Sequence, residues 1–448
     1  METSILNYWS QMNGWEIALN AAPLGLLLAL AALLPLNPKT SDWWEDPRHK
    51  AILCALFALG GVLVYCVPTQ DFSRVFQTYL DYSAFLMVMA SLFVVSGGIR
   101  LEGGLAGTPG GNSLFLLLGA VLSNWLGTTG ASMLLIRPFL RMNRRRSAKT
   151  HLAVFFIFIV SNAGQFLPLG PPMYLGYLKG VPFLWNLYLV PPFALWVGML
   201  LLLFYGVDCW IARNESWMGK GQKKASPFRL EGWPNVGWLL LIVAGILFSG
   251  YGLIPALVPG WGETGAEAWS KGFQVLWMGG IALLSYRNTS SAIHRKNQFH
   301  FAPILEVAVL FFGIFGAMIP ALALLEAKWP ALPLNQPWEF FWASGLFSSI
   351  LDNAPTYLNF TVLAASQQGI APSHLGQLAA GFPRLLAAIS CGASFMGALT
   401  YIGNGPNLLV KAVAEGNGVK MPSFGGYILW SLVLLTPVFL VETLIFFR

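Results

Sequence analysis

Four short polar stretches interrupt the apolar segments of this 448-residue chain, and their residue types could bind a small ion. Stretches 123–132 and 348–356 combine serine, threonine and asparagine with turn-forming residues, and stretches 160–172 and 390–407 add more between glycines and prolines. Hard cations such as sodium take oxygen ligands of this kind. The candidate ion- or substrate-binding residues are Asn124, Thr128, Thr129, Ser132, Ser161, Asn162, Asp352, Asn353, Thr356, Ser390, Ser394, Asn404 and Asn407. Of these, Asp352, Asn124 and Asn162 are the candidate sodium ligands.

Asp352 is the carboxylate of this set, and we expect it to exchange a proton for a sodium ion. An ionisable side chain inside a membrane is costly, which makes it a functional candidate. Burial favours the protonated form and a bound cation favours the ionised form, so both ions would compete for the same oxygens. The alternative is structural. Asp352 would then cap a hairpin beside Pro355, and the small polar residues would only pack helices together.

The composition indicates a helical protein that crosses a membrane many times. The chain is 56% hydrophobic and 10% charged, whereas soluble domains carry about 25% charged residues. Its apolar runs are continuous, unlike the alternating pattern of membrane β-barrels, and many approach the ~20 residues that span a bilayer as a helix. We expect an all-α polytopic protein of the bacterial inner membrane, in contact with membrane lipids and with its first span retained.

The net charge of +7 does not indicate nucleic-acid binding, because the basic residues cluster in short loops, where they set membrane orientation. The four cysteines lack the spacing of a metal site. The five histidines fall in loops or at the ends of spans, where none is expected to act as a metal ligand or proton shuttle. Since catalysis would need paired reactive groups within the spans, we expect neither an enzyme nor a cofactor, only sodium ions and protons as transported or coupling ions.

The apolar pattern predicts two halves joined by a cytoplasmic linker. The first repeat covers 1–207, the linker 208–233 and the second repeat 234–448. Each half contains one re-entrant hairpin, at 113–140 and 337–366, and one broken helix, at 151–180 and 375–413. The other expected crossings are 16–36, 50–67, 79–99, 187–207, 234–253, 269–286, 301–325 and 424–447.

The loop charges predict that the two halves are inverted relative to each other. Basic residues gather at 141–149 and in the linker, while loops 254–268 and 367–374 contain no lysine or arginine. The positive-inside rule is satisfied if each hairpin enters and leaves on one side, which leaves five crossings per half. Five is odd, as in the inverted repeats of secondary transporters. Equal offsets support the repeat, because 229 positions separate Ser123 from Asp352 and Ser161 from Ser390.

Other charged residues at the spans have weaker roles in this interpretation. Asp81 and Glu306 lie early in the helices before the two hairpins, near the interface, and are candidates for a proton relay. Arg137 is expected to extend its long side chain from the exit of the first hairpin to the interface. Arg384 is the basic residue well inside the second broken segment.

The same motifs resemble a known family. Segments Ser123–Pro138, Leu351–Tyr357 and Gly397–Asn407 are similar to NhaD-type sodium:proton antiporters of the ion-transporter superfamily, which are often labelled putative citrate transporters. The similarity runs from about Tyr79 to the C-terminus. It implies a scaffold domain, a mobile domain that carries the hairpins and broken helices, a homodimer and elevator-type alternating access.

The sequence departs from this family in its first broken helix. The family usually has an acidic residue between a glycine and two prolines, whereas here Gly170 is followed directly by Pro171, and Gln165 stands where glycine is common. The departure puts one cation site in doubt and gives Asp352 a larger part in the exchange.

Two functions remain open, with a small ion or a carboxylate as substrate. The first is sodium:proton antiport, favoured by the scarcity of basic residues at the predicted site. The second is sodium- or proton-coupled uptake of citrate or another carboxylate, in which helix N-termini hold the anion. Arsenite-type efflux is a less favoured third.

Overall fold

The computed structural model describes residues 8–9, 11–34, 38–104, 107–164, 176, 180–213, 215, 226–250, 262–328, 334–370 and 374–448. Within this part, six helices are long and apolar enough to cross a membrane, and the pair Leu375–Gly381 and Pro383–Leu399, bent by 112°, is a seventh candidate. The predicted helical, multi-pass membrane protein is confirmed at this level.

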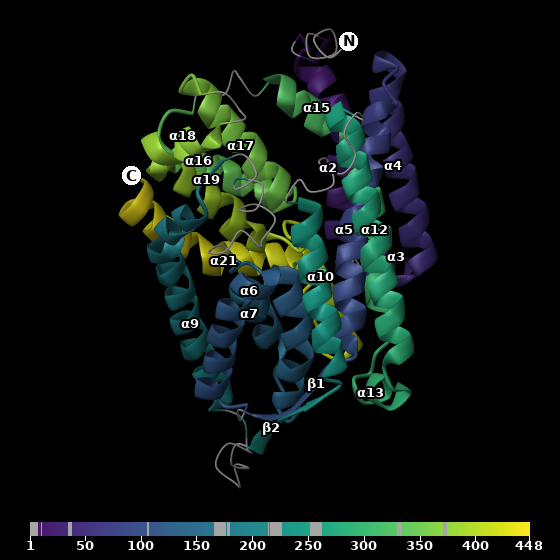
Figure 1. Cartoon of the computed structure of the whole chain (residues 1–448), viewed down its shortest axis with the longest axis vertical. Coiled ribbons are helices and arrows are strands. Elements are labelled where there is room, and N and C mark those ends of the chain that lie inside the picture. Colours follow the sequence, from purple (N-terminus) through teal and green to yellow (C-terminus); the bar gives the residue numbers. More distant parts are fainter. Residues whose placement is uncertain are drawn as a thin grey trace.

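Seven long or medium helices form one side of the molecule, which we call the framework bundle (Figure 1). They are α2 (Gly14–Leu33), α4 (Pro47–Thr69), α5 (Ser73–Gly97), α10 (Pro234–Gly250), α12 (Gly262–Asn288), α14 (Ala302–Ala317) and α15 (Ile319–Lys328), with the short α3 (Pro38–Glu45) and α13 (Ser291–Lys296) beside them. The crossing expected at 301–325 is therefore two helices, α14 and α15, which meet at Met318.

Glycines allow the framework helices α4 and α14 to approach closely. A Cβ atom on Gly61 would lie 2.4 Å from the Gly316 carbonyl oxygen, and one on Gly313 would lie 2.7 Å from Cys54 Cβ. In a membrane, where lipid tails are as apolar as leucine, small residues promote helix association by letting backbones touch. This contact holds one side of the framework bundle together.

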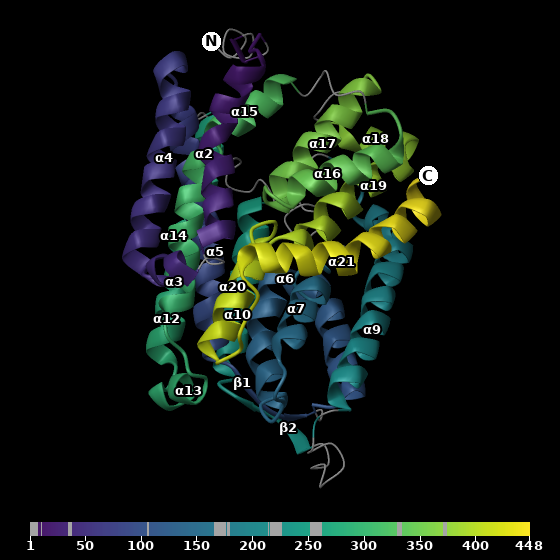
Figure 2. The ribbon, with the colours of Figure 1, turned by 180° about the vertical axis from the view of Figure 1, so that it is seen from behind.

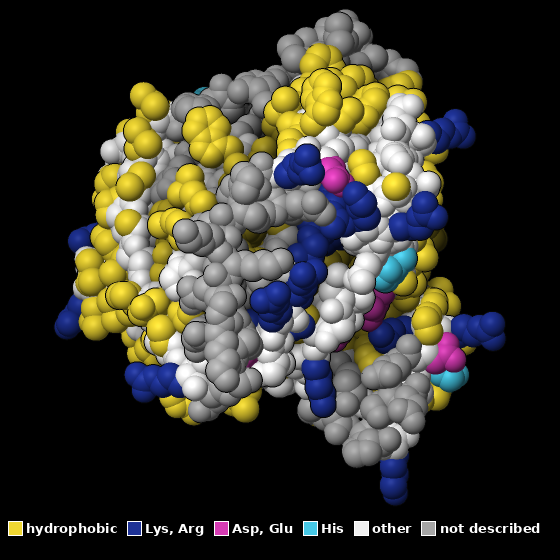
Figure 3. All heavy atoms as spheres, turned by 90° about the horizontal axis from the view of Figure 1, so that it is seen from below, with side chains coloured by type: hydrophobic (Ala, Val, Ile, Leu, Met, Phe, Trp, Pro, Cys, Tyr) yellow, Lys and Arg dark blue, Asp and Glu magenta, His cyan; other side chains and the backbone are white. Residues whose placement is uncertain are grey.

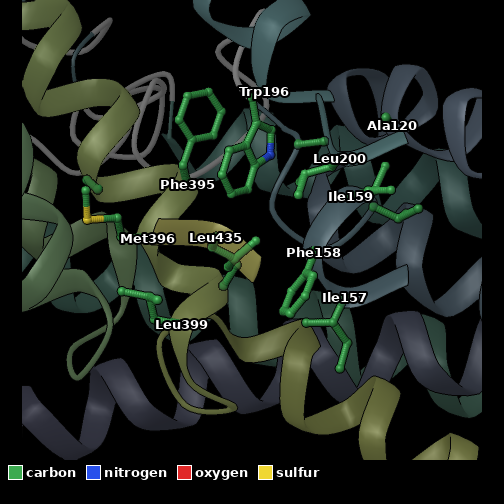
Figure 4. Packing of buried hydrophobic residues seen from close by; sticks show 14 of the residues in the cluster. Ala120, Ile157, Phe158, Ile159, Trp196, Leu200, Phe395, Met396, Leu399 and Leu435 are labelled. Atoms are coloured by element: carbon green, nitrogen blue, oxygen red, sulfur yellow. The ribbon is translucent and has the colours of Figure 1, made fainter. Parts of the chain in front are cut away.

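The remaining helices form a second group, the core bundle. They are α6 (Pro109–Met142), α7 (Thr150–Ile159), η2 (Phe183–Leu189), α9 (Val190–Ala212), α16 (Pro337–Ser348), α17 (Asn353–Gln367), α18 (Leu375–Gly381), α19 (Pro383–Phe395), η4 (Met396–Leu399), α20 (Gly405–Gly416), α21 (Phe424–Glu442) and η5 (Thr443–Phe447). Helix α21 runs across α6 and α7 at a large angle (Figure 2). Figure 4 shows the apolar interior where α7, α9, α19 and α21 meet, with Trp196 beside Phe395.

Helix α6 folds back on itself at Gly127, whose backbone is non-helical (φ 71°, ψ 160°). The rings of Phe115 and Phe139 stack with centroids 5.2 Å apart, although a straight helix would separate these residues by about 36 Å. Asn143 Nδ2 also donates to Asn112 Oδ1 (2.8 Å) near the two ends of α6. Positive φ suits glycine, which lacks a Cβ, so Gly127 forms the tip of a helical hairpin.

Helices α16 and α17 form a second hairpin, with residues 349–352 between them. Phe347 and Phe360 lie with ring centroids 5.7 Å apart, a separation that a continuous helix would stretch to about 20 Å. Helix α16 packs along its length against α19, and α17 packs against α19 as well. The tip of this hairpin therefore lies next to the helix that leads into the stretch 396–407.

A buried charged cluster closes the base of the first hairpin. Arg146 forms an ion pair with Asp208 at the end of α9, and its Nε lies 3.3 Å from Glu215 Oε2. His151 Nε2 lies 2.9 Å from Asp208 Oδ1, and Asn112 Nδ2 donates to Asp208 Oδ2 (2.9 Å). His151 thus lies at the end of a span, as expected, but it is buried and belongs to an ionic network that the sequence interpretation did not foresee.

A two-stranded ribbon departs from the all-α prediction. Strand β1 (Arg100–Gly104) pairs antiparallel with β2 (Ser226–Glu231), so that Arg100 faces Glu231. Strand β2 belongs to the predicted linker. Because α9 continues to Ala212, the first residues assigned to the linker are also helical. The linker is therefore attached to the segment that precedes the first hairpin.

The face that carries the ribbon and α13 is rich in lysine and arginine, as Figure 3 shows from below. Exposed cations there come from the loop after α6, from β2 and from the α12–α13 region. They are Arg144, Arg145, Arg229, Arg287, Arg295 and Lys296. The positive-inside rule predicts that this face lies in the cytoplasm.

The fold of α6 predicts a cross-link. In a background without the native cysteines, a short thiol cross-linker should join Phe115→Cys to Phe139→Cys, because the two rings stack. Mass spectrometry of the digested protein would detect the linked peptides. The control pair, Phe115→Cys with Leu126→Cys, lies on a single arm and should stay unlinked. A straight α6 would leave both pairs unlinked.

The buried cluster predicts a stability effect. Asp208→Asn should lower the free energy of unfolding by about 3 kcal/mol or more, because it leaves the Arg146 guanidinium without its nearest buried counter-charge. Thermal unfolding of the purified protein in detergent would measure the change. Glu415→Gln is the control, since it removes an i,i+4 pair with Lys411 at the surface that is worth about 0–1 kcal/mol. Equal melting temperatures for both variants would contradict the structural role of the cluster.

Candidate functional site

The first unwound segment, which we call the first break, covers 160–164 at the end of α7. The Val160 carbonyl accepts a hydrogen bond from Ser123 Oγ (2.8 Å), which lies on the first arm of the α6 hairpin. A Cβ on Gly164 would lie 2.8 Å from Thr128 Cγ2 and 3.1 Å from the Ser123 carbonyl oxygen. The break therefore rests against the tip of the first hairpin. The predicted features Gln165, Pro168, Gly170, Pro171 and Pro172 lie outside the described residues.

The second unwound segment, the second break, covers 400–404 between η4 and α20. Thr400 Oγ1 donates to the Ser349 carbonyl, in the tip of the second hairpin. It also accepts from the backbone amides of Ile402 (3.2 Å) and Gly403 (3.0 Å). A Cβ on Gly403 would lie 2.7 Å from the Gly397 oxygen and 2.8 Å from the Ser348 oxygen. Each break is thus packed against one hairpin tip.

Three asparagines join the two breaks. Asn162 Nδ2 donates to Asn407 Oδ1 (3.1 Å). Asn404 Nδ2 lies 2.6 Å from the Ser161 carbonyl oxygen and 3.2 Å from Asn162 Oδ1. All three side chains are buried. We call Asn162, Asn404 and Asn407 the asparagine bridge.

The bridge satisfies carbonyls that the breaks leave without helical partners. Asn407 Nδ2 donates to the carbonyls of Gly397 (2.9 Å) and Thr400 (3.0 Å), and Asn162 Nδ2 donates to that of Ile157 (2.8 Å). A non-helical backbone at membrane depth is tolerated only when protein or water satisfies its polar groups. An asparagine side chain has both a carbonyl and an amide, so it can do this while linking two segments.

Ser132 and Ser161 extend the contact to the second arm of the first hairpin, since their hydroxyl oxygens lie 2.9 Å apart. The structure therefore brings together Ser132, Ser161 and the asparagine bridge. Thr128 lies against Gly164 at the same tip. No lysine or arginine occurs in 123–132, 161–164, 348–356 or 396–407, so the polar residues here are neutral except for one carboxylate.

That carboxylate is Asp352, which stands at the N-cap position of α17 in the second hairpin tip. Its carboxylate lies against the backbone N–H of Asn353, the first residue of α17, but it makes no N-cap hydrogen bond farther into the helix. The Asp352 carbonyl, rather than the carboxylate, accepts the Thr356 hydroxyl (3.0 Å). Asp352 is half-buried, whereas Asn353 and Thr356 are buried. The structural alternative for Asp352 therefore rests on one backbone contact at the start of α17, and the functional role stays a prediction.

Several predicted residues do not join the bridge. Asn124 donates to the Ala120 carbonyl of its own helix (2.9 Å), Thr129 is half-buried at the first tip, and Ser394 is buried in α19 with no hydrogen-bond partner for its hydroxyl. Ser390 lies within the predicted second broken segment, 375–413, but outside the 400–404 break. Ser390 lies in the middle of α19, where its hydroxyl donates to the Leu386 carbonyl (2.7 Å).

The two equal offsets do not join equivalent points of the breaks or of the hairpin tips. Ser161 lies in the first break, whereas the corresponding second break begins at Thr400, ten positions after Ser390. Ser123 and Asp352 are not equivalent either. Ser123 precedes the Gly127 turn by a helical turn, while Asp352 ends the 349–352 connection. The offsets alone therefore do not establish the inverted repeat, which stays a prediction.

Three charged residues outside the breaks were given roles from the sequence, and the structure shows where each one lies. Arg137 does not reach the interface: it is 5% exposed and lies over the rings of Phe93 (4.9 Å) and Phe299 (5.9 Å). Glu306 lies 2.6 Å from Lys50 Nζ, and Asp81 forms an ion pair with Lys271. These two acids are paired within the framework bundle, which gives no support to a proton relay through them.

Thr400, which joins the second break to the second hairpin tip, was not among the predicted site residues, although it belongs to the motif Gly397–Asn407. Sequence reasoning also missed Glu442, which is 0% exposed near the end of α21. The sequence did contain a signal for it, because Glu442 is an acidic residue within the predicted apolar crossing 424–447.

Comparison with known proteins identifies the family of this architecture. A family model described as putative citrate transport matches residues 15–447, which is nearly the whole chain. The chain belongs to this transporter family. No curated protein matches the chain significantly. The family description agrees with the broader prediction of a transporter.

Gly403 provides a test of the contact between the second break and its hairpin. Gly403→Ala should strongly reduce transport in proteoliposomes, because the new Cβ would meet backbone atoms of residues 348, 349 and 397 within 3.0 Å. Gly198→Ala is the matched control, since nothing lies within 4 Å of a Cβ at that helical position. Wild-type transport by Gly403→Ala, in folded protein, would contradict the packing described.

Proposed function

We propose that this protein is a secondary active transporter that exchanges sodium ions for protons. The observation that carries the proposal is the asparagine bridge, which joins two unwound segments in the middle of the core bundle. Each unwound segment also rests against a hairpin tip. Such an arrangement concentrates oxygens and free helix ends at one place, which is how secondary transporters build ion sites.

The chemistry of these residues favours a cation. Serine, threonine and asparagine offer neutral oxygens, and Asp352 adds one negative charge near the second break. A proton on Asp352 would cancel that charge and so weaken sodium binding. Competition between the two ions at one carboxylate is the minimum that an exchange mechanism needs. The candidate sodium ligands are Asp352 and Asn162, with Asn124 nearby on the first hairpin.

The two helix groups suggest how access alternates. The core bundle carries both hairpins and both breaks, and the framework bundle carries neither. The bundles meet where Gly405, at the start of α20, approaches Phe85 and Met89 of α5. In an elevator mechanism the core bundle would move as a body against the framework, exposing the site first to one side of the membrane and then to the other.

The pairing of each break with its own hairpin supports the inverted-repeat prediction. Helix α7 enters the first break from the side of the basic face, whereas α19 enters the second from the opposite side (Figure 2). Residence in a bacterial inner membrane and assembly as a homodimer remain part of this proposal.

Uptake of citrate or another carboxylate is the second candidate function. The family description favours it, and the N-termini of α17 and α20 begin next to the hairpin tip and the second break. Helix N-termini attract anions because their backbone N–H groups are free. A trivalent anion would nevertheless meet the Asp352 carboxylate and no lysine or arginine in the breaks or tips.

Asp352→Asn tests the leading proposal. Proteoliposomes with a trapped pH-sensitive dye should release protons when sodium is added to the wild-type protein, and the variant should lose most of this response. The reason is that an amide cannot exchange a proton near neutral pH. Lithium, potassium and citrate, added in turn, define which ion drives the flux.

Asp46→Asn is the matched control, because Asp46 is an exposed N-cap of α4 and asparagine caps a helix about equally well. It should exchange sodium like the wild type. Accumulation of labelled citrate, with no proton release on adding sodium, would contradict antiport and favour the second candidate.

A further inference from the structure

Glu442 is a buried carboxyl group that the proposed site does not use. It is the last residue of α21 and is 0% exposed. Among the described residues, no side chain donates a hydrogen bond to its carboxyl oxygens, and the polar group that approaches them is the backbone N–H of Trp196. An ionised carboxylate in such a place would cost several kcal/mol, because one backbone contact does not replace its lost hydration. The geometry therefore favours the neutral, protonated acid.

The side chains around Glu442 come from α9, α16, α19 and η5. Trp196 of α9 stacks between Phe395 of α19 (centroids 4.7 Å apart) and Phe439 of α21 (5.3 Å). Glu442 follows Phe439 by one helical turn, and the backbone N–H of Trp196 approaches its carboxyl group. On α16, Trp342 Nε1 donates to Thr443 Oγ1 (3.0 Å). These contacts place Glu442 in an aromatic, water-poor environment.

The titratable and charged groups of these elements give Glu442 no counter-ion. Cys391, a buried thiol of α19, lies close enough for a charge on Glu442 to act on it, but a thiol is no counter-ion. Arg384, also on α19, is exposed, and its guanidinium donates to the carbonyl of Arg448 beyond η5 (3.1 Å). Glu339 of α16 accepts backbone hydrogen bonds at the start of that helix. The residue of α9 that packs next to this end of α21 is Trp196, whose side chain is uncharged. Within the described residues, the charge on Glu442 would stand uncompensated.

A purely structural role does not explain such a residue. An acid without a cationic partner gains too little here from one backbone contact to offset its burial, and an apolar residue of similar size would stabilise the same space better. Intramembrane ionisable residues are kept for function in most cases. Helix α19 connects Glu442 to the site, because Cys391 precedes the unpartnered Ser394 by one turn, and α19 continues through η4 to the second break.

We propose that Glu442 is a second proton-binding site of this transporter, distinct from Asp352. The charge on Glu442 affects the packing of α19 against α21. On ionisation the carboxyl O–H bond breaks, its electron pair stays on oxygen, and the proton passes to a water molecule that reaches the site when the helices move. Reprotonation reverses the step. The inference deepens the proposed function and depends on it for the role in transport, but the proton on Glu442 can be tested separately.

Glu442→Gln provides the test, because glutamine has nearly the shape of a protonated glutamate but cannot release a proton. In lipid, Asp352→Asn should still display the infrared carbonyl band of a protonated carboxylic acid, shifted by exchange into deuterium oxide, and adding Glu442→Gln should remove this band. In proteoliposomes Glu442→Gln alone should also change the wild-type dependence of the transport rate on pH. Glu442→Asp, which keeps an acid, should retain both features at least in part.

Glu339→Gln is the control, since Glu339 accepts hydrogen bonds at the surface and its removal should leave the band in place. An unchanged band when Glu442→Gln is added to Asp352→Asn would overturn the proposal, and so would an unchanged pH dependence in Glu442→Gln alone. A monodisperse elution profile would establish that each variant is folded. If wild-type protein exchanged no sodium for protons, antiport would fail, while the band would still report whether Glu442 carries a proton.

Discussion

The structure depends on one constraint: backbone that leaves the helical conformation inside a membrane must find other hydrogen-bond partners. Two segments break this way, after α7 and after η4. The partners come from Asn162, Asn404 and Asn407, whose side chains bond to carbonyls of both breaks and to one another. The same bonds that make each break tolerable therefore also tie the two halves of the chain together. The hairpins α6 and α16–α17 pack against these breaks, so the hairpin tips and the breaks form one connected group of contacts.

Charged side chains inside a membrane face the same constraint, because little water is present to solvate them. Where ions are needed for structure, they are paired, as in the buried cluster of Arg146 with Asp208 and Glu215. Arg137 lacks such a pair but lies over the faces of Phe93 and Phe299, whose π electrons partly replace hydration. Among the described residues, neither Asp352 nor Glu442 is paired with a lysine or arginine, and a backbone N–H approaches each carboxyl group. These two acids thus differ from the acids of the buried cluster, whose charges are compensated.

Much of the fold could be predicted from sequence because its signals are local. Continuous apolar runs fix the helices, and glycines and polar residues within them indicate where the backbone turns, as at Gly127. The long-range features could not be predicted in this way. Ser390 does not mark the 400–404 break, because serine tolerates a helix interior by donating to the carbonyl four residues earlier, as its hydroxyl does with Leu386. Arg137 and Glu442 were misplaced or missed because burial depends on which helices pack against a residue. The pairing of β2 with β1 joins residues more than 120 positions apart, which no local pattern encodes.

The asparagine bridge is the central claim, and a double-mutant cycle tests it most directly. Transport rates would be measured for Asn162→Ala, Asn407→Ala and the double variant in proteoliposomes. Because the two side chains share one hydrogen bond, the loss in the double variant should be smaller than the product of the single losses, by about 2-fold to 100-fold. Losses that multiply independently would contradict the account, since they would mean that the two breaks do not act on each other.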